Sequence, residues 1–262
     1  MEGKRGLIIG VANEKSIAWA IAKSVHHAGA QLALTYQNTL LERRVRPLAK
    51  EIGSDIVIPC DVEDPLHMES LFKTLKETWG HIDFIVHSLA WSDKEALRGR
   101  YIETTRENFT RTLAISCFSL TEIVRHALPL MKDRGGSIVT MSYYGAEKAI
   151  PNYNVMGVAK AALEASVRYL AMDVGHYGIR VNALSAGPIK TLAASGIGDF
   201  NAIRQWAERN APLRRTVTQE DIAASGHYLL SDLSRGVSGE VHHVDCGYHI
   251  VGMEYTHHAH TS

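Results

Sequence analysis

The sequence predicts an α/β protein, a single-domain, Rossmann-like, doubly wound parallel sheet of about seven strands with helices on both faces. One observation is that short apolar runs alternate with amphipathic segments, the order expected of β–α units joined by right-handed crossovers. Another is that several runs are apolar without interruption, as in strands covered on both faces. The expected strands are Gly6–Ala12, Gln31–Tyr36, Asp55–Cys60, Ile82–Ser88, Gly136–Ser142, Arg180–Ser185 and Glu240–Val244.

The helices expected between these strands carry start and stop signals. Asp64 followed by Pro65 has the pattern of an N-cap and a first helical residue. Glycine stands at or near the end of each of three amphipathic segments, where left-handed C-caps are common. The segments are Ser16–Ala28, Leu66–Trp79 and Tyr153–Tyr177, and the glycines are Gly29, Gly80 and Gly175.

Length and composition indicate one globular domain. The chain has 262 residues, 45% hydrophobic and 21% charged. We expect the domain to cover residues 1–253 and a polar tail to follow over 254–262. Because 28 basic residues balance 28 acidic ones, no overall field favours nucleic acid. No apolar run reaches the roughly 18 residues of a membrane span, and a strand-like start leaves no room for a signal peptide, so we expect a cytoplasmic protein.

The cysteines and the terminal histidines do not predict a metal site. Cys60, Cys117 and Cys246 are scattered, odd in number and without a CxxC pair, so neither a disulfide framework nor a zinc site is expected. The tail carries His257, His258 and His260. Metal binding there competes with a frayed terminus, which we favour.

The end of the first strand is a candidate phosphate-binding loop. Gly10, Ala12 and Ser16 are small, and a helix follows at once, so backbone amides and the helix N-terminus can face a pyrophosphate. The segment is not GxGxxG, and a plain strand–helix turn explains it equally well. At the end of the second strand, Gln37 can bond a ribose hydroxyl without neutralising a phosphate, which favours NADH. Asp61, after the third strand, suits either the adenine amino group or a turn.

Tyr153 and Lys160 are the candidate catalytic pair. Seven residues separate them, about two turns of helix, so on one helix they share a face about 10 Å apart along the axis. Tyr143, at the end of the fifth strand, is a second candidate. A neutral phenol can stabilise negative charge that develops on an oxygen, and a protonated lysine can hold ribose hydroxyls.

Four segments carry a family resemblance. They are Gly10–Ala18, His87–Ala90, Ile150–Gly157 and Ser185–Gly196. Together they resemble the bacterial enoyl-acyl-carrier-protein reductases, a divergent branch of the short-chain dehydrogenases/reductases, over essentially residues 3–253. The general superfamily has lysine four residues after tyrosine, whereas here position 156 is Met156, so a carbonyl (3-ketoacyl) reductase is the weaker alternative. A non-catalytic NAD-binding regulator is the other, and Tyr143, Tyr153 and Lys160 argue against it.

The resemblance implies a reaction, partners and site residues. It implies NADH-dependent reduction of the trans-2 double bond of enoyl thioesters on acyl carrier protein, the last reductive step of type II fatty acid elongation, by a homotetramer. A segment around 191–210, which begins with a small, Gly-rich stretch, would form a lid. The implied NAD-binding residues are Gly10, Ser16, Ile17, Gln37, Asp61, Val62, Ser88, Leu89, Lys160, Ile189, Thr191 and Ala193. The implied substrate residues are Ser92, Tyr143, Tyr153, Met156, Ile197 and Phe200, although core packing is an alternative for the last three. Candidates for a basic rim facing the acidic carrier protein are Lys190, Arg204, Arg214 and Arg215, although an ordinary solvated charge is the favoured alternative for any single one.

Overall fold

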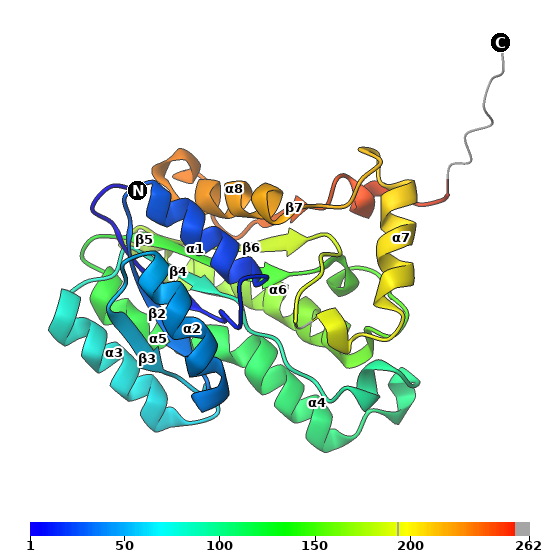
Figure 1. Cartoon of the computed structure of the whole chain (residues 1–262), viewed down its shortest axis with the longest axis horizontal. Coiled ribbons are helices and arrows are strands. Elements are labelled where there is room, and N and C mark those ends of the chain that lie inside the picture. The colour runs from blue at the N-terminus through cyan, green and yellow to red at the C-terminus, as the bar shows by residue number, and fades with distance from the viewer. Residues whose placement is uncertain (193, 255–262) are drawn as a thin grey trace, which may run out of the picture.

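The computed structural model describes residues 1–192 and 194–254 and shows one all-parallel sheet (Figure 1). Its strand order is β3-β2-β1-β4-β5-β6-β7, so the chain winds outward from β1 in one direction and then returns to continue in the other. This confirms the predicted doubly wound sheet. The strands are β1 (Arg5–Ile9), β2 (Gln31–Tyr36), β3 (Ile56–Pro59), β4 (Phe84–His87), β5 (Gly136–Ser142), β6 (Ile179–Ala186) and β7 (Val241–Val244).

Helices cover both faces of the sheet and bury two apolar clusters. Helices α1, α2 and α8 contribute Trp19, Val45 and Leu229 to one cluster, and Figure 1 shows α1 and α8 side by side over that face. Helices α3, α5 and α6 contribute residues such as Leu71 and Leu163 to the other. The helices are α1 (Ile17–His27), α2 (Thr39–Glu51), α3 (Pro65–Trp79), α4 (Arg106–Leu113), α5 (Ser119–Met131), α6 (Asn154–Val174), α7 (Phe200–Asn210) and α8 (Gln219–Leu230).

Most of the expected start and stop signals act where the sequence placed them. The Asp64 side chain accepts a hydrogen bond from the backbone of Leu66, 2.9 Å away, and Pro65 begins α3. Gly29 (φ 92°) and Gly80 (φ 74°) are left-handed. The expectation for position 175 was wrong, because Gly175 (φ −62°) continues as a 3-10 turn. The left-handed residue is Gly178 (φ 72°), three positions later.

One continuous helical stretch, Arg106–Met131, is long and apolar enough by length and composition to cross a membrane, with a mean hydropathy of 1.2. It comprises α4, a π-helical segment (Ala114–Phe118) and α5. Half of its most apolar window is buried inside the protein, where Leu120 and Ile123 pack in the core. Its apolar composition is therefore explained by packing against α3 and α6.

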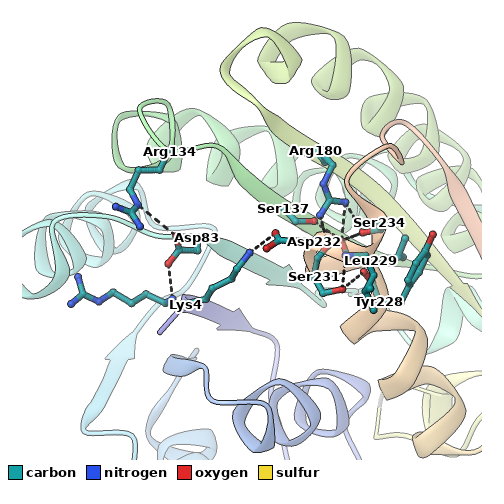
Figure 2. A network of polar contacts seen from close by, with 12 residues as sticks. Lys4, Asp83, Arg134, Ser137, Arg180, Tyr228, Leu229, Ser231, Asp232 and Ser234 are labelled. Atoms are coloured by element: carbon teal, nitrogen blue, oxygen red, sulfur yellow. Dashed lines mark hydrogen bonds and ion pairs between the residues drawn. The ribbon is translucent and has the colours of Figure 1, made fainter. Parts of the chain in front are cut away.

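A polar network joins the amino ends of the central strands to the end of α8, far from the carboxyl ends where ligands bind in such sheets (Figure 2). The Arg180 guanidinium donates to the carbonyls of Leu229 and Ser231, each at 3.0 Å, and to the Ser234 hydroxyl at 2.8 Å. Lys4 pairs with Asp232 at 2.5 Å. Because these groups satisfy one another, we interpret the network as structural.

His87, at the carboxyl end of β4, is fully buried and held in one tautomer. Ser119 donates its only hydroxyl proton to the Ile115 carbonyl, 2.6 Å away. The Nε2 atom of His87 must therefore donate to Ser119 (2.9 Å), and its Nδ1 atom accepts from Thr140 (2.7 Å). Burial, followed by the charge of Lys160, lowers the pKa of His87 to about 3.

This histidine predicts a loss of stability in mild acid. In the unfolded chain His87 has a pKa of about 6.5, so below that pH it is protonated when unfolded and neutral when folded. Its contribution to stability is therefore complete above pH 6.5 and falls as the pH drops toward 3. Between pH 7 and 5 the loss is about 2 kcal/mol. The free energy of unfolding, measured with urea, should differ less between pH 7 and pH 5 in His87→Gln than in the wild type, by about this amount. The glutamine side chain keeps a donor and an acceptor. An unchanged difference would contradict the assignment.

Candidate active site

A cavity of about 740 Å³ opens at the carboxyl ends of the strands and gathers the residues singled out from the sequence. Those expected to hold the cofactor, apart from Lys160, are Gly10, Ser16, Ile17, Gln37, Asp61, Val62, Ser88, Leu89, Ile189 and Thr191. Those expected at the reacting centre and acyl chain are Ser92, Tyr143, Tyr153, Met156, Lys160, Ile197 and Phe200. Ala193 lies outside the described residues, and the other predicted site residues all line this one cavity.

The loop between β1 and α1 is held by Ser16 and needs a glycine at its start. Gly10 is left-handed (φ 102°), and a Cβ there would lie 2.0 Å from the Ser88 carbonyl oxygen. The Ser16 hydroxyl accepts from the backbone N–H groups of Ala12 (3.0 Å) and Asn13 (3.1 Å). Those two amides therefore bond the serine instead of facing a ligand. A pyrophosphate in this cavity would be met by the N-terminus of α1, which begins at Ile17.

The ends of β2 and β3 favour a cofactor without a ribose phosphate. The Gln37 amide lies 3.4 Å from the Asp61 carboxylate and donates to it. The negative charge of Asp61 beside the neutral amide disfavours a cofactor with a phosphate on this ribose. Arg43 and Arg44 are exposed on α2, and Arg46 is engaged by Glu42 at 2.7 Å.

Lys160 is a buried cation that bridges two strand ends. Its Nζ donates to the Met141 carbonyl at 2.7 Å, at the end of β5, and lies 3.5 Å from the Leu89 carbonyl, just past β4. Within the described residues two of the three ammonium N–H groups have partners, and the third can donate to a ligand. Burial lowers the pKa of Lys160 to about 8, against the opposing effect of Cys117 and Glu164.

Two phenols line the same cavity as this cation: Tyr153 is buried and Tyr143 is partly buried. The rings of Tyr143 and Tyr153 meet edge to face, with centroids 5.0 Å apart and planes at 75°. Burial is the main cause that raises the pKa of both hydroxyls above the usual range, so both are neutral donors at pH 7. The Tyr143 hydroxyl lies within reach of the Tyr248 hydroxyl, which contributes to its raised pKa, but no hydrogen bond of normal length satisfies it within the described part of the chain. Such a group is ready to bond a ligand oxygen.

Tyr153 does not share a helix with Lys160 in the simple way that the spacing suggested. Helix α6 begins at Asn154, and Tyr153 is its N-cap residue. Asn154 itself has a left-handed backbone (φ 43°), so the rise of about 1.5 Å per residue holds only from Val155 onward. Only Lys160 takes its position from the helix, whereas Tyr153 takes its position from the preceding loop.

Sequence reasoning missed two features that support the pair. Gly145 makes room for the tyrosine, because a Cβ there would lie 2.3 Å from the Tyr153 ring. Glu164 is buried one turn after Lys160 and accepts a 2.5 Å hydrogen bond from Ser142. A charged residue four positions from the lysine, in an otherwise apolar helical stretch, was the available signal.

The side of the cavity that holds the expected substrate residues is partly a packed apolar core. Tyr153, Met156 and Leu97 form a small buried cluster, and Ile197 packs against it, while all four side chains also line the cavity. Ser92 is engaged with Asn108 at 3.4 Å. Tyr144, for which the sequence suggested no role, packs edge to face on Tyr248.

These features define a class. A parallel sheet with its switch point between β1 and β4, a cavity at that point, and a buried Tyr–Lys pair are those of a dinucleotide-dependent oxidoreductase of the Rossmann class.

Comparison with known proteins gives the family. Residues 10–249 match the family described as enoyl-(acyl carrier protein) reductase. The chain is 61% identical over 97% of its length to enoyl-acyl-carrier-protein reductase (NADH) 1 of Rhizobium meliloti (strain 1021), covering 93% of that protein. It is 57% identical to the corresponding enzyme of Rickettsia felis, over 96% of both chains. The crystal structure of the Anaplasma phagocytophilum reductase in complex with NAD superposes with a TM-score of 0.94 at 57% identity, covering 98% of this chain and 97% of that one. The chain belongs to the enoyl-(acyl carrier protein) reductase family.

Proposed function

We propose that this protein uses NADH to reduce the trans-2 double bond of enoyl thioesters carried on acyl carrier protein, the last reductive step of type II fatty acid elongation. The activity is that of its family. The observation that carries the site assignment is the buried, protonatable Lys160, which lines one cavity with two neutral phenols at the carboxyl ends of the strands.

The residues present fit the cofactor. Gly10 lets the loop lie close to the end of β4, the α1 N-terminus supplies partial positive charge, and Gln37 could bond a ribose hydroxyl. Bound NADH supplies a hydride to the β-carbon of the enoyl group. The assignment of Ala193 to the cofactor rests on the resemblance alone.

The chain's own groups stabilise the charge that follows. As the β-carbon is reduced, negative charge develops on the thioester oxygen. Tyr153 donates a hydrogen bond to that oxygen, and the unsatisfied Tyr143 hydroxyl is a second donor. Lys160 remains protonated, holds ribose hydroxyls with its third N–H, and adds positive potential. The final proton to carbon comes from a tyrosine or from water.

The domain and lid are also proposals. We assign residues 1–253 to one reductase domain, with a lid over 191–210 and a tail from 254 onward. Within the described residues the lid holds a 3-10 turn (Ala194–Gly196) and α7. Ile197 and Phe200 line the cavity from this side, so closure would cover the acyl chain.

The carrier protein requires a positive rim near the lid. Of the four candidates, Arg204 lies 3.9 Å from Glu208 and Arg215 pairs with Asp221, which reduces the charge that they offer. Arg214 bonds the Arg209 carbonyl. Lys190 is exposed beside the lid, so we favour it as the contact with an acidic carrier protein in the cytoplasm.

We propose a homotetramer, which an exposed apolar face on α6 supports. Val158, Tyr169 and Met172 are exposed on one side of α6, at spacings of eleven and three residues that return to the same face. Such a face fits one of the two-fold interfaces that a tetramer of paired dimers requires.

The α6 face predicts the effect of a charge. Met172→Glu would bury a carboxylate against its symmetry mate, so light scattering should show a shift from tetramer to smaller species. Leu66→Glu, at a leucine on α3 that is also largely exposed, should leave the mass unchanged. A tetrameric Met172→Glu protein would remove α6 from the interface.

The test of function is NADH oxidation with a trans-2-enoyl thioester, repeated with NADPH and with a β-ketoacyl thioester. We expect turnover of the enoyl substrate with NADH. Turnover of the ketoacyl substrate alone would make the protein a carbonyl reductase, and no turnover with cofactor binding intact would favour a regulator.

A further inference from the structure

The active-site tyrosine lies between two asparagines with left-handed backbones. Asn152 has φ 64° and Asn154 has φ 43°. Residues other than glycine rarely adopt this conformation, and asparagine tolerates it best. Two such residues around one buried side chain indicate that surrounding contacts hold this loop in place.

The side chain of Asn154 ties the tyrosine loop to the segment that follows β4. Its amide nitrogen donates to the carbonyls of Ala96 (2.8 Å) and Gly99 (3.0 Å), so both amide hydrogens are used. Leu97, between these carbonyls, packs in the buried cluster of Tyr153. The backbone of Tyr153 is thus fixed from the next residue, and its ring is held by the same segment.

The side chain of Asn152 reaches the lid instead. Its amide nitrogen donates to the Gly198 carbonyl at 3.2 Å and to the Asp199 carboxylate at 3.4 Å. The Gly198 N–H in turn donates to the Leu97 carbonyl at 3.2 Å. A Cβ at Gly198 would lie 3.2 Å from both Asn152 and Leu97, so glycine permits this close approach.

We propose that Asn152 and Asn154 are positioning residues with different tasks: Asn154 fixes Tyr153, and Asn152 is a latch that holds the lid closed against the tyrosine loop. The proposal rests on the proposed function for its kinetic consequences. The bonds of Asn154 are short and reach two backbone carbonyls, so they persist. The bonds of Asn152 are longer, and one reaches an exposed carboxylate, so they are the ones that break when the lid opens to admit an acyl chain.

Glycine is the substitution that isolates each amide, because it keeps the left-handed backbone accessible. In Asn154→Gly, we expect kcat for the enoyl thioester to fall about tenfold while KM for NADH stays unchanged. In Asn154→Asp, which places a carboxylate against two carbonyls, kcat should fall further. Wild-type kcat in Asn154→Gly, or a fall in kcat matched by the same loss of NADH binding, would overturn the positioning role.

In Asn152→Gly, we expect KM for the enoyl thioester to rise about threefold with kcat retained. Limited trypsin digestion at Lys190, Arg204 and Arg209 should be several-fold faster than in the wild type, because the lid opens more often. Digestion at the wild-type rate would overturn the latch. Asn154→Gly, at the neighbouring left-handed position (φ 43°) whose amide bonds Ala96 and Gly99 and not the lid, controls for added backbone freedom and should digest as the wild type does.

The digestion needs no turnover, so it separates the two proposals. If the wild type fails to reduce enoyl thioesters but Asn152→Gly still exposes the lid, the proposed function fails and the latch stands. If turnover is normal and the lid of Asn152→Gly stays protected, the latch fails alone.

Discussion

Lys160→Ala is expected to lower kcat/KM for the enoyl thioester about a thousandfold, which corresponds to about 4 kcal/mol of transition-state stabilisation. The ammonium group is the charge that our mechanism places at the reacting centre, and it is buried where Coulomb interactions are strong. Its loss removes a charged hydrogen bond to the ribose and leaves the Met141 carbonyl, 2.7 Å from Nζ, without its partner. Steady-state kinetics with varied NADH measures both effects.

The same residue sets a pH limit. Because the pKa of Lys160 is lowered to about 8, the ammonium form predominates below that pH and is lost as pH rises through it. The wild-type kcat/KM should therefore decline above pH 8. Lys160→Arg is the matched control, since arginine stays protonated and its residual activity should lack this limb. A wild-type profile that stays flat to pH 10, or near-normal activity of Lys160→Ala, would remove the lysine from the mechanism.

Tyr153→Phe should lower kcat by a factor of about 100 to 1,000 with little change in KM for NADH, because one donor to the developing oxyanion is lost. The ring, its edge-to-face contact with Tyr143 and the fit against Gly145 all remain. Tyr143→Phe is the comparison. Its hydroxyl interacts only weakly with the Tyr248 hydroxyl in the described structure, so its removal costs little, and we expect a smaller fall in kcat and a thermal stability close to that of the wild type.

The relative sizes of these two effects decide which phenol bonds the thioester oxygen. If Tyr143→Phe loses more activity than Tyr153→Phe, the roles are exchanged. If neither variant differs from the wild type, water supplies both stabilisation and proton, and the tyrosines only shape the cavity.

The fold followed from periodicity and from local signals. Apolar strand runs separated by amphipathic helices specify a parallel sheet because each face must be covered. The cap of Asp64 and the left-handed glycines at 29 and 80 act through bonds to neighbours a few residues away, so short windows of sequence contain them. Position 175 failed because the helix end is a 3-10 turn, which moves the left-handed residue to Gly178.

The sequence predicted which residues line the candidate site but not how they contact one another. The sequence by itself determined the sheet, the ends of the strands where residues such as Gly10, Gln37 and Lys160 cluster, and the family to which they are similar, because all of these depend on order along the chain. Only the tertiary structure decided that Ser16 engages the loop amides, that Lys160 bonds two strand ends, and that two left-handed asparagines hold Tyr153. Those arrangements depend on contacts between residues far apart in sequence, such as Asn154 with Ala96 and Asn152 with Gly198, and no local pattern encodes which distant carbonyl an amide will meet.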